Sequence, residues 1–125
     1  MSLRVALHAH HRSLHEHGGV PGIRDRGGLE AALARPQNLF AYSERQITRF
    51  DLAAAYGFGI ARAHPFVDGN KRTAAIASMA FLDRNGIQVD APQVEVYETF
   101  MSLAEGKTRE SELAKWLERY SQRLK

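Results

Sequence analysis

The sequence predicts an all-α domain of about six helices around two buried central ones, with a polar loop between those two. Two observations support this fold class. Apolar residues recur at helical spacing between capping and helix-breaking residues, and an alternation with period two never persists. With 125 residues, 44% of them hydrophobic, the chain is expected to form one domain over residues 1–125 with its own core.

Residues 2–17 are predicted to form the first helix, because Ser2 can cap its start and Gly18 follows its end. A loop rich in Gly and Pro comes next. Residues 28–35 are predicted to form a short second helix, which Pro36 stops.

The stretch from 36 to 47 has no clear period and is the one segment expected to form a short hairpin or flap. The residues in it that favour extended structure are Leu39, Phe40, Tyr42 and Ile47. Thr48 and Asp51 have the spacing of a capping box, so a third helix should begin near Arg49 and run to about Ala63.

This third helix and its successor are predicted to be the central pair, because apolar residues fall on several of their faces. Pro65 disfavours helical geometry at His64 and separates the two helices. The second of them covers residues 71–84 and ends at Asn85, which a glycine follows.

Two more helices are predicted after it. Asp90 and Pro92 open a helix that runs to about Glu105 and closes at Gly106, and Thr108 is expected to cap the last helix. The last helix carries a one-sided apolar stripe, expected to be core: Leu113, Trp116, Leu117 and Tyr120.

The composition excludes several classes of protein. The chain contains no cysteine, so disulfide scaffolds, thiol nucleophiles and cysteine-based metal sites are excluded. No apolar run approaches a membrane span, and the first residues are too His-rich for a secretory signal, so a cytoplasmic location is expected. The net charge of +3 suits an anionic ligand such as a nucleotide, whereas no helix carries a continuous basic face for nucleic acid.

The segment HPFVDGNKR, residues 64–72, places many polar groups between the two central helices. Buried polar groups are costly unless they are paired, so this placement indicates a functional site. Gly69 and Asn70 permit tight backbone geometry just before a helix begins. The free N–H groups of Asn70, Lys71 and Arg72 should then attract an anion, above all phosphate.

Four side chains of this segment suit phosphoryl transfer. Lys71 and Arg72 supply positive charge, and a guanidinium can hold a phosphate with two hydrogen bonds. Asp68 would be repelled by a phosphate unless a hard cation lay between them, which suggests Mg²⁺. His64 is the nearby side chain suited to accept a proton.

Each of these residues, taken singly, also has a purely structural explanation. Asp68 could cap the following helix, Lys71 and Arg72 could be solvated, and His64 could be a satisfied core histidine. The order of all of them together is much harder to explain in this way. The segment is not a Walker P-loop, because no Gly lies at the required offset before Lys71.

HPFVDGNKR resembles the signature of the Fic/Doc family, His-Pro-Phe-x-Asp/Glu-Gly-Asn-Gly/Lys-Arg, and its Lys-Arg ending is similar to that of the Doc (death-on-curing) toxins. The segments HGGVPGIRDRGGLEAALARPQ and AAIASMAFLDRNGI are also similar to Doc-like proteins, so the resemblance covers roughly residues 7–120. It implies a compact Fic-type helical fold with the motif loop in a central cleft.

The resemblance implies a role for each motif residue. In the family the histidine deprotonates a target hydroxyl, here His64, and the acidic residue binds the metal, here Asp68. Gly69 and Asn70 would form the anion hole, and Arg72 would hold a distal phosphate of the nucleotide.

Phe66 would anchor the loop in the core, and residues 36–47 would be the flap that docks the target. Most Fic proteins have Gly where this chain has Lys71, and they transfer AMP from ATP to a protein hydroxyl. Doc-like members carry Lys there, and in them the reversed nucleotide gives up its γ-phosphoryl group to a Thr of elongation factor Tu. Gly69 stands where Doc toxins often have Ala, so AMP transfer stays open as an alternative.

The resemblance thus implies a Ser/Thr phosphotransferase toxin that uses ATP and Mg²⁺ and arrests translation. A non-catalytic basic helical binding module and a catalytically dead Fic fold also stay open. No Ser or Thr lies four residues before a Glu-Gly or Glu-Asn pair, the pattern of a self-inhibitory helix. A separate antitoxin is therefore implied, Phd-like, with its C-terminal helix in the cleft.

Two further features have plain explanations. His8, His10, His11, His15 and His17 crowd the first helix, and the pair His11 and His15 has metal-binding spacing, but a solvated face is the favoured interpretation. Arg24 and Asp25 either flank the cleft or pair with each other at the surface.

Overall fold

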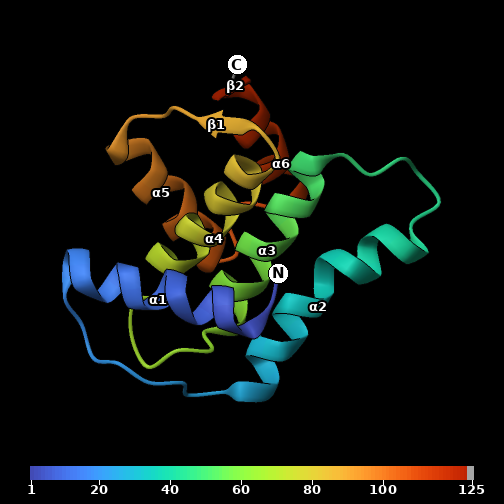
Figure 1. Ribbon diagram of the computed structural model, residues 1–125. Coiled ribbons are helices and arrows are strands. Elements are labelled where there is room, and N and C mark those ends of the chain that lie inside the picture. The colour runs from blue at the N-terminus through green and yellow to red at the C-terminus, as the bar shows by residue number, and fades with distance from the viewer. Residues whose placement is uncertain (124–125) are drawn as a thin grey trace.

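The computed structural model describes residues 1–123, which fold into six α-helices and one two-stranded sheet (Figure 1). The helices are α1 (Leu3–His17), α2 (Arg26–Tyr42), α3 (Arg49–Ala63), α4 (Asn70–Arg84), α5 (Gln93–Ala104) and α6 (Glu110–Arg119). The strands are β1 (Ile87–Val89) and β2 (Ser121–Arg123). The prediction of a mostly helical domain of about six helices is confirmed.

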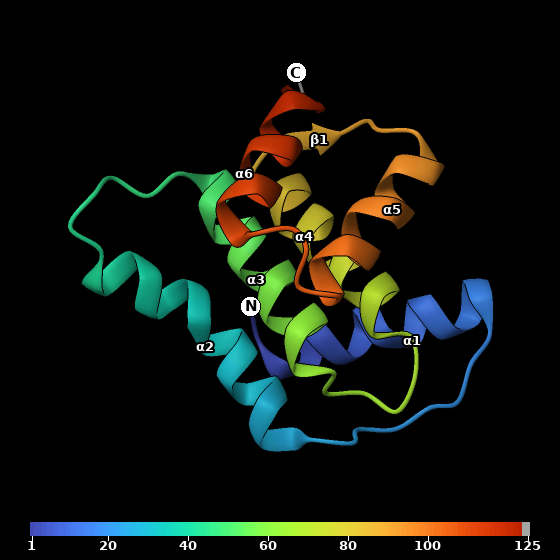
Figure 2. The ribbon, with the colours of Figure 1, turned by 180° about the vertical axis from the view of Figure 1, so that it is seen from behind.

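Helices α3 and α4 occupy the centre, with α1, α2, α5 and α6 around them in both views (Figures 1 and 2). Small residues let the central pair approach closely. Gly57 of α3 packs on Ser78 of α4, whose Oγ would lie only 2.3 Å from a Cβ at position 57. That hydroxyl donates to the Ala53 carbonyl at 2.9 Å, so the buried polar atom is satisfied.

The capping and helix-breaking residues predicted the ends of two helices, α1 and α3. The Ser2 side chain accepts from the Val5 N–H and opens α1, which Gly18 follows. At α3, Thr48 and Asp51 form the expected capping box. Helix α3 ends at His64, whose left-handed backbone (φ 48°, ψ 53°) agrees with the helix break expected before Pro65.

The prediction that Pro36 stops the second helix is wrong, because α2 continues through it to Tyr42. Its buried side chains follow a helical period that includes the proline: Leu29, Ala32, Leu33 and Pro36. Burial of this stripe offsets the cost of the backbone hydrogen bond that is lost at Pro36. Helix α2 therefore bends in its middle instead of ending (Figures 1 and 2).

The hairpin or flap expected over residues 36–47 is also not formed. Its first part is the end of α2, and residues 43–48 are an irregular loop that protrudes from the molecule (Figure 1). Phe40 and Tyr42, which suggested extended structure, are exposed on the last turn of the helix.

The end of the chain departs from the prediction in three details. The N-cap of α6 is Arg109, whose backbone N–H donates to Glu112, while the Thr108 hydroxyl instead bonds Ser102 at 2.7 Å. The strands β1 and β2 pair antiparallel with Gln88 opposite Gln122, and three-residue strands give no periodic signal in a sequence. Leu113 and Leu117 are buried in the core as expected, whereas Trp116 is half-buried against Phe100.

Within residues 1–123, no helix has the length and apolar character that crossing a bilayer requires.

Candidate active site

The loop between α3 and α4 takes its shape from two residues in left-handed conformation. His64 has φ 48° at the end of α3, and Gly69 has φ 74° immediately before α4. The prediction of tight geometry at Gly69 is confirmed, while Asn70 is already helical. Helix α4 therefore begins with its free backbone N–H groups at the loop, as the anion site requires.

The buried side chain of Asn70 holds this loop closed. Its Oδ1 accepts from the Phe66 N–H at 2.9 Å, and its Nδ2 donates to the Phe66 carbonyl at 3.0 Å. Phe66 is itself fully buried, as expected for the anchor of the loop. Because Oδ1 and one Nδ2 hydrogen are used here, Asn70 has its backbone N–H and its second Nδ2 hydrogen left to offer an anion.

The prediction of a solvated face is wrong for His10, which is buried and also supports the loop. His10 of α1 is buried and stacks on Phe66, with ring centroids 3.8 Å apart. Its Nε2 lies 2.9 Å from the Asp68 carbonyl, an acceptor, so the ring carries a proton on that nitrogen. The helical spacing of the sequence could have indicated its burial, because His10 shares one helical face with the buried residues Ala6 and Ser13.

The other histidines of α1 match the solvated face that was predicted: His8, His11, His15 and His17 are exposed. No cluster of three or more potential metal-ligating His, Asp or Glu side chains occurs among the residues that the structure describes.

The segment after α1 pairs with the loop along its length. Val67 donates its N–H to the Gly22 carbonyl at 3.0 Å, and Ile23 forms an antiparallel bridge with Phe66. Arg24 and Asp25 do not pair with each other. Arg24 bonds carbonyls at the end of α3, and Asp25 caps α2 by accepting from the Gly28 N–H at 2.9 Å.

Asp68 is exposed at the mouth of the loop. Its Oδ2 accepts from the Val20 N–H at 3.2 Å and its Oδ1 from the Gly69 N–H at 2.8 Å. These two backbone hydrogen bonds, helped by the nearby charge of Arg72, hold the pKa of Asp68 below its ordinary value. The alternative explanation of Asp68, as a cap of α4, does not apply, because the N-cap is Gly69 and has no side-chain cap.

The donor set fits Mg²⁺. Asp68 is ionised, exposed and retains free lone pairs, and Mg²⁺ sites in proteins commonly use one or two carboxylates together with waters and substrate phosphates.

The two cations of the motif lie at the start of α4 and are half-buried. Arg72 donates from Nε to the Ser13 hydroxyl at 3.3 Å and from Nη2 to the Gly18 carbonyl at 3.1 Å. The end of α1 thus orients this guanidinium beside Asp68.

One cleft of about 1200 Å³ contains all six residues that the sequence singled out: His64, Asp68, Gly69, Asn70, Lys71 and Arg72. Away from the loop, the cleft continues between α4 and α5 over apolar side chains that include Ile76, Met79 and Tyr97. The structure brings the predicted residues together, and their individual roles remain predictions.

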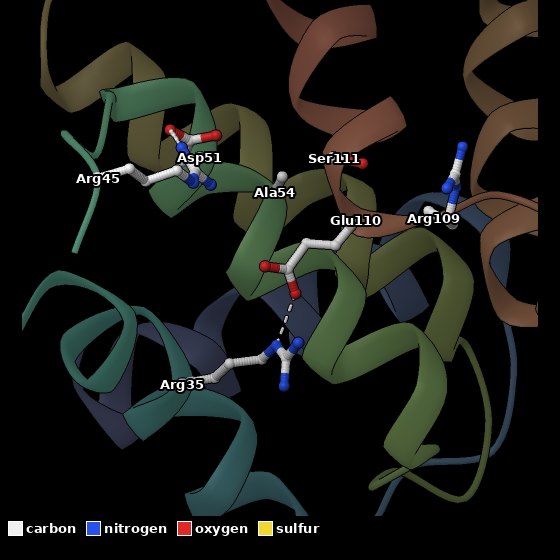
Figure 3. A pocket seen from close by; sticks show the side chains of 7 residues that line it. All are labelled: Arg35, Arg45, Asp51, Ala54, Arg109, Glu110 and Ser111. Atoms are coloured by element: carbon white, nitrogen blue, oxygen red, sulfur yellow. Dashed lines mark hydrogen bonds and ion pairs between the residues drawn. The ribbon is translucent and has the colours of Figure 1, made fainter. Parts of the chain in front are cut away.

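A smaller pocket of about 280 Å³ lies elsewhere, where α2, α3 and α6 meet (Figure 3). Its charged side chains are engaged with one another or with neighbours: Arg35 with Glu110 at 2.7 Å, Arg45 with Asp51 at 3.0 Å and Arg109 with Glu112 at 3.2 Å. Of these pairs, Arg35 with Glu110 joins two helices, and every charged side chain that lines the pocket has an opposite charge beside it.

Comparison with known proteins agrees with this geometry. The profile described as "Fic/DOC family" matches residues 1–82. The chain is 40% identical over 117 residues to "Protein kinase doc" of Escherichia phage P1, which covers 92% of this chain and 88% of that protein. It is 46% identical over 74 residues to "Toxin Doc" of Mycolicibacterium smegmatis, covering 59% of this chain and 57% of that protein.

Proposed function

The chain belongs to the Fic/DOC family, and we propose that it is a Doc-like toxin that transfers the γ-phosphoryl group of ATP to a Ser or Thr hydroxyl of a translation factor similar to elongation factor Tu. One observation carries the proposal. A histidine, a carboxylate, two cations and the N-terminus of α4 surround one cleft that also has room for a protein segment. The names of the two relatives, a protein kinase and a toxin, support the same activity.

In this proposal His64 is the general base. It accepts the proton of the target hydroxyl as that oxygen bonds to the γ-phosphorus, and the bond from this phosphorus to the β–γ bridging oxygen breaks. ADP and the phosphorylated protein are the products. The exposed position of His64 at the edge of the cleft suits this role, because the target oxygen must reach it from outside.

The N-terminus of α4 and its two cations would bind the phosphates. Backbone N–H groups there point away from the helix, and Lys71 and Arg72 add two positive charges at the same end. These donors are fixed before substrate arrives, since Ser13 and the Gly18 carbonyl already orient Arg72. Preorganised donors of this kind stabilise the charge that develops during transfer.

Asp68 would hold Mg²⁺, which supplies neutralisation of phosphate charge when bound. The lowered pKa of Asp68 keeps the carboxylate ionised well into the acid range, so the ligand is available throughout physiological pH.

AMP transfer is the second candidate, and Gly69 favours it. Its positive φ is a conformation in which glycine is the least strained residue, and the sequence HPFVDGN agrees with the general Fic pattern at this position. Lys71 favours γ-phosphoryl transfer, because its stem occupies the cleft wall where a Gly would leave space.

ATP labelled separately at two positions distinguishes the candidates. The purified protein is incubated with a cell extract, MgCl₂ and ATP labelled at the γ- or the α-phosphorus. Label in protein from the γ-position alone supports the kinase, and label from the α-position supports AMP transfer. No label from either, with a folded protein, contradicts both and favours a non-catalytic binding module.

We also propose an antitoxin partner, Phd-like, whose C-terminal helix lies in the apolar part of the cleft. Val94 and Tyr97 on α5 are 67% and 59% exposed along it, which suits the anchors of an amphipathic helix. The net charge of +3 favours an acidic partner. Co-expression with such a partner should relieve growth arrest, and an unchanged arrest contradicts the proposal.

A further inference from the structure

Arg24 lies outside the motif and does not line the cleft, yet it bonds directly to the backbone of the motif histidine. Its Nε donates to the His64 carbonyl at 2.9 Å, and Nη2 donates to the same carbonyl. The same Nη2 also donates to the Ala63 carbonyl at 3.1 Å. One guanidinium thus satisfies two of the carbonyls that α3 leaves free at its end.

The residue that Arg24 holds is a strained one. His64 is the one non-glycine residue with a positive φ among residues 1–123. For a side-chain-bearing residue this conformation is strained, so surrounding contacts must maintain it. Pro65 disfavours the helical conformation at His64 but leaves the extended one accessible, and an extended His64 would carry the imidazole to a different place.

Arg24 is itself held in a fixed position relative to the loop. Its backbone N–H donates to the Pro65 carbonyl at 2.7 Å, and the next N–H, of Asp25, donates to the same oxygen at 3.0 Å. The Asp25 side chain then fastens this segment to the start of α2. The side chain of Arg24 therefore extends from a rigid base, and its positive charge meets the negative end of the α3 dipole.

We propose that Arg24 is a positioning residue, which locks the backbone of His64 in the left-handed conformation that places its imidazole at the cleft. It acts through His64 and touches no substrate. The proposal deepens the role proposed for His64 and rests, for its kinetic readout, on the phosphotransferase function proposed above.

The kinetic test compares Arg24→Ala with Arg26→Ala. Arg26 is a matched control on the same segment, since it forms only an exposed pair with Glu30 at 3.1 Å. Arg24→Ala is expected to lower kcat at least about tenfold, because small misplacements of a catalytic group cost up to about 100-fold, while KM for ATP stays within about twofold. Arg24→Lys keeps the charge but lacks the planar guanidinium that bonds two carbonyls, so its kcat should lie between those of Arg24→Ala and the wild type. Arg26→Ala should retain wild-type kinetics.

Three kinetic results would overturn the proposal: wild-type kcat in Arg24→Ala, a raised KM with unchanged kcat, or an equal loss in Arg26→Ala. If Arg24→Ala does not fold, Arg24→Gln, which retains one donor, is measured against the same three results.

NMR of the histidine side chains separates this proposal from the kinase proposal, since it needs no activity. In Arg24→Ala, the Cε1–Hε1 resonance of His64 should move toward its position in an unfolded peptide and broaden, while the resonances of His8 and His11 stay in place. An unmoved His64 resonance overturns the positioning role even if the kinase proposal holds. A moved resonance in a protein that transfers no label supports positioning while the kinase proposal fails.

Discussion

The imidazole of His10 lies flat against the ring of Phe66, with centroids 3.8 Å apart and ring planes 7° from parallel. One face of the motif loop therefore rests on α1, whose His10 precedes Asp68 by 58 residues. His10 supports the loop in two ways, by this ring stack and by a hydrogen bond that the same imidazole donates to the Asp68 carbonyl.

Replacing His10 should loosen the loop. His10→Ala removes the ring stack and the hydrogen bond, which together are worth about 1–3 kcal/mol of unfolding free energy. His10→Phe keeps a stack but leaves the Asp68 carbonyl without its donor, so an intermediate loss is expected. Urea denaturation measures both, with the exposed neighbour His11→Ala as the control. Equal stability of His10→Ala and His11→Ala would contradict the support that we assign to His10.

Replacing His64 should abolish transfer and leave the fold intact. His64→Asn is the sharper variant, because Asn tolerates the left-handed backbone that His64 adopts but is not a base at neutral pH. A general base contributes typically about 10²–10⁴-fold, so a single-turnover rate lower by that factor is expected, with an unchanged circular dichroism spectrum. A wild-type rate would mean that another group accepts the proton.

Lys71→Gly creates the general Fic sequence at this position. Loss of γ-phosphoryl transfer is expected, with AMP transfer appearing, because the space that the lysine stem fills becomes open to the nucleotide. ATP labelled at the γ- or the α-phosphorus measures the change. An unchanged reaction with γ-labelled ATP would show that Lys71 does not choose the orientation of the nucleotide.

Gly69→Ala tests how tightly the loop is packed. The new Cβ would be strained at φ 74° and would lie 3.2 Å from the Ser13 hydroxyl, the group that orients Arg72. Gly86→Ala is a matched control, with φ 76° and no atom within 4 Å of its Cβ. Thermal melts should show a loss of about 1 kcal/mol or more in both variants, whereas only Gly69→Ala should also raise KM for ATP. An equal KM in the two variants would contradict the coupling between Gly69 and Arg72.

The capping box of α3 predicts acid sensitivity. Partial burial raises the pKa of Asp51, but hydrogen bonds from Thr48 and Arg45 lower it more, so that the pKa lies below its ordinary value. Asp51 therefore stabilises the fold above the ordinary aspartate value of about 3.9, and this contribution is lost as the pH falls through the lower pKa of the folded state. Asp51→Ala should cost about 1 kcal/mol at pH 7 and progressively less below pH ~4 in urea titrations. A cost independent of pH would contradict this account.

Much of the helical fold could be predicted from local signals. Ser2 at α1 and the Thr48–Asp51 pair at α3 act through bonds within a few residues, and these bonds form in the structure as expected. Pro36 misled the prediction because a local rule, helix breaking, lost to burial of a stripe against α3. The stripe was visible in the sequence spacing. Whether its burial stabilises the helix more than Pro36 destabilises it depends on the tertiary contact.

The site was predictable in part, because its motif residues are also close together in the sequence. Its six motif residues lie within nine positions and meet in one cleft, as their order indicated. The contacts of His10 and Arg24 with the loop were not predicted, because their partners, Asp68 and His64, lie 58 and 40 residues away and pattern alone does not reveal such pairs.

The long separation of these supports has a consequence for when the motif loop takes shape during synthesis. The bonds from Val20, Arg24 and Ser13 to the motif join residues 40–59 positions apart, and such distant closures form after local helices because they carry a larger entropic cost. A nascent chain in which α3 and α4 are already helical still lacks these contacts to the motif loop until α1 and the following segment dock against it. Folding thus completes the motif loop after the local helices, so the shape of this loop depends on the docking of α1 and of the segment that follows it.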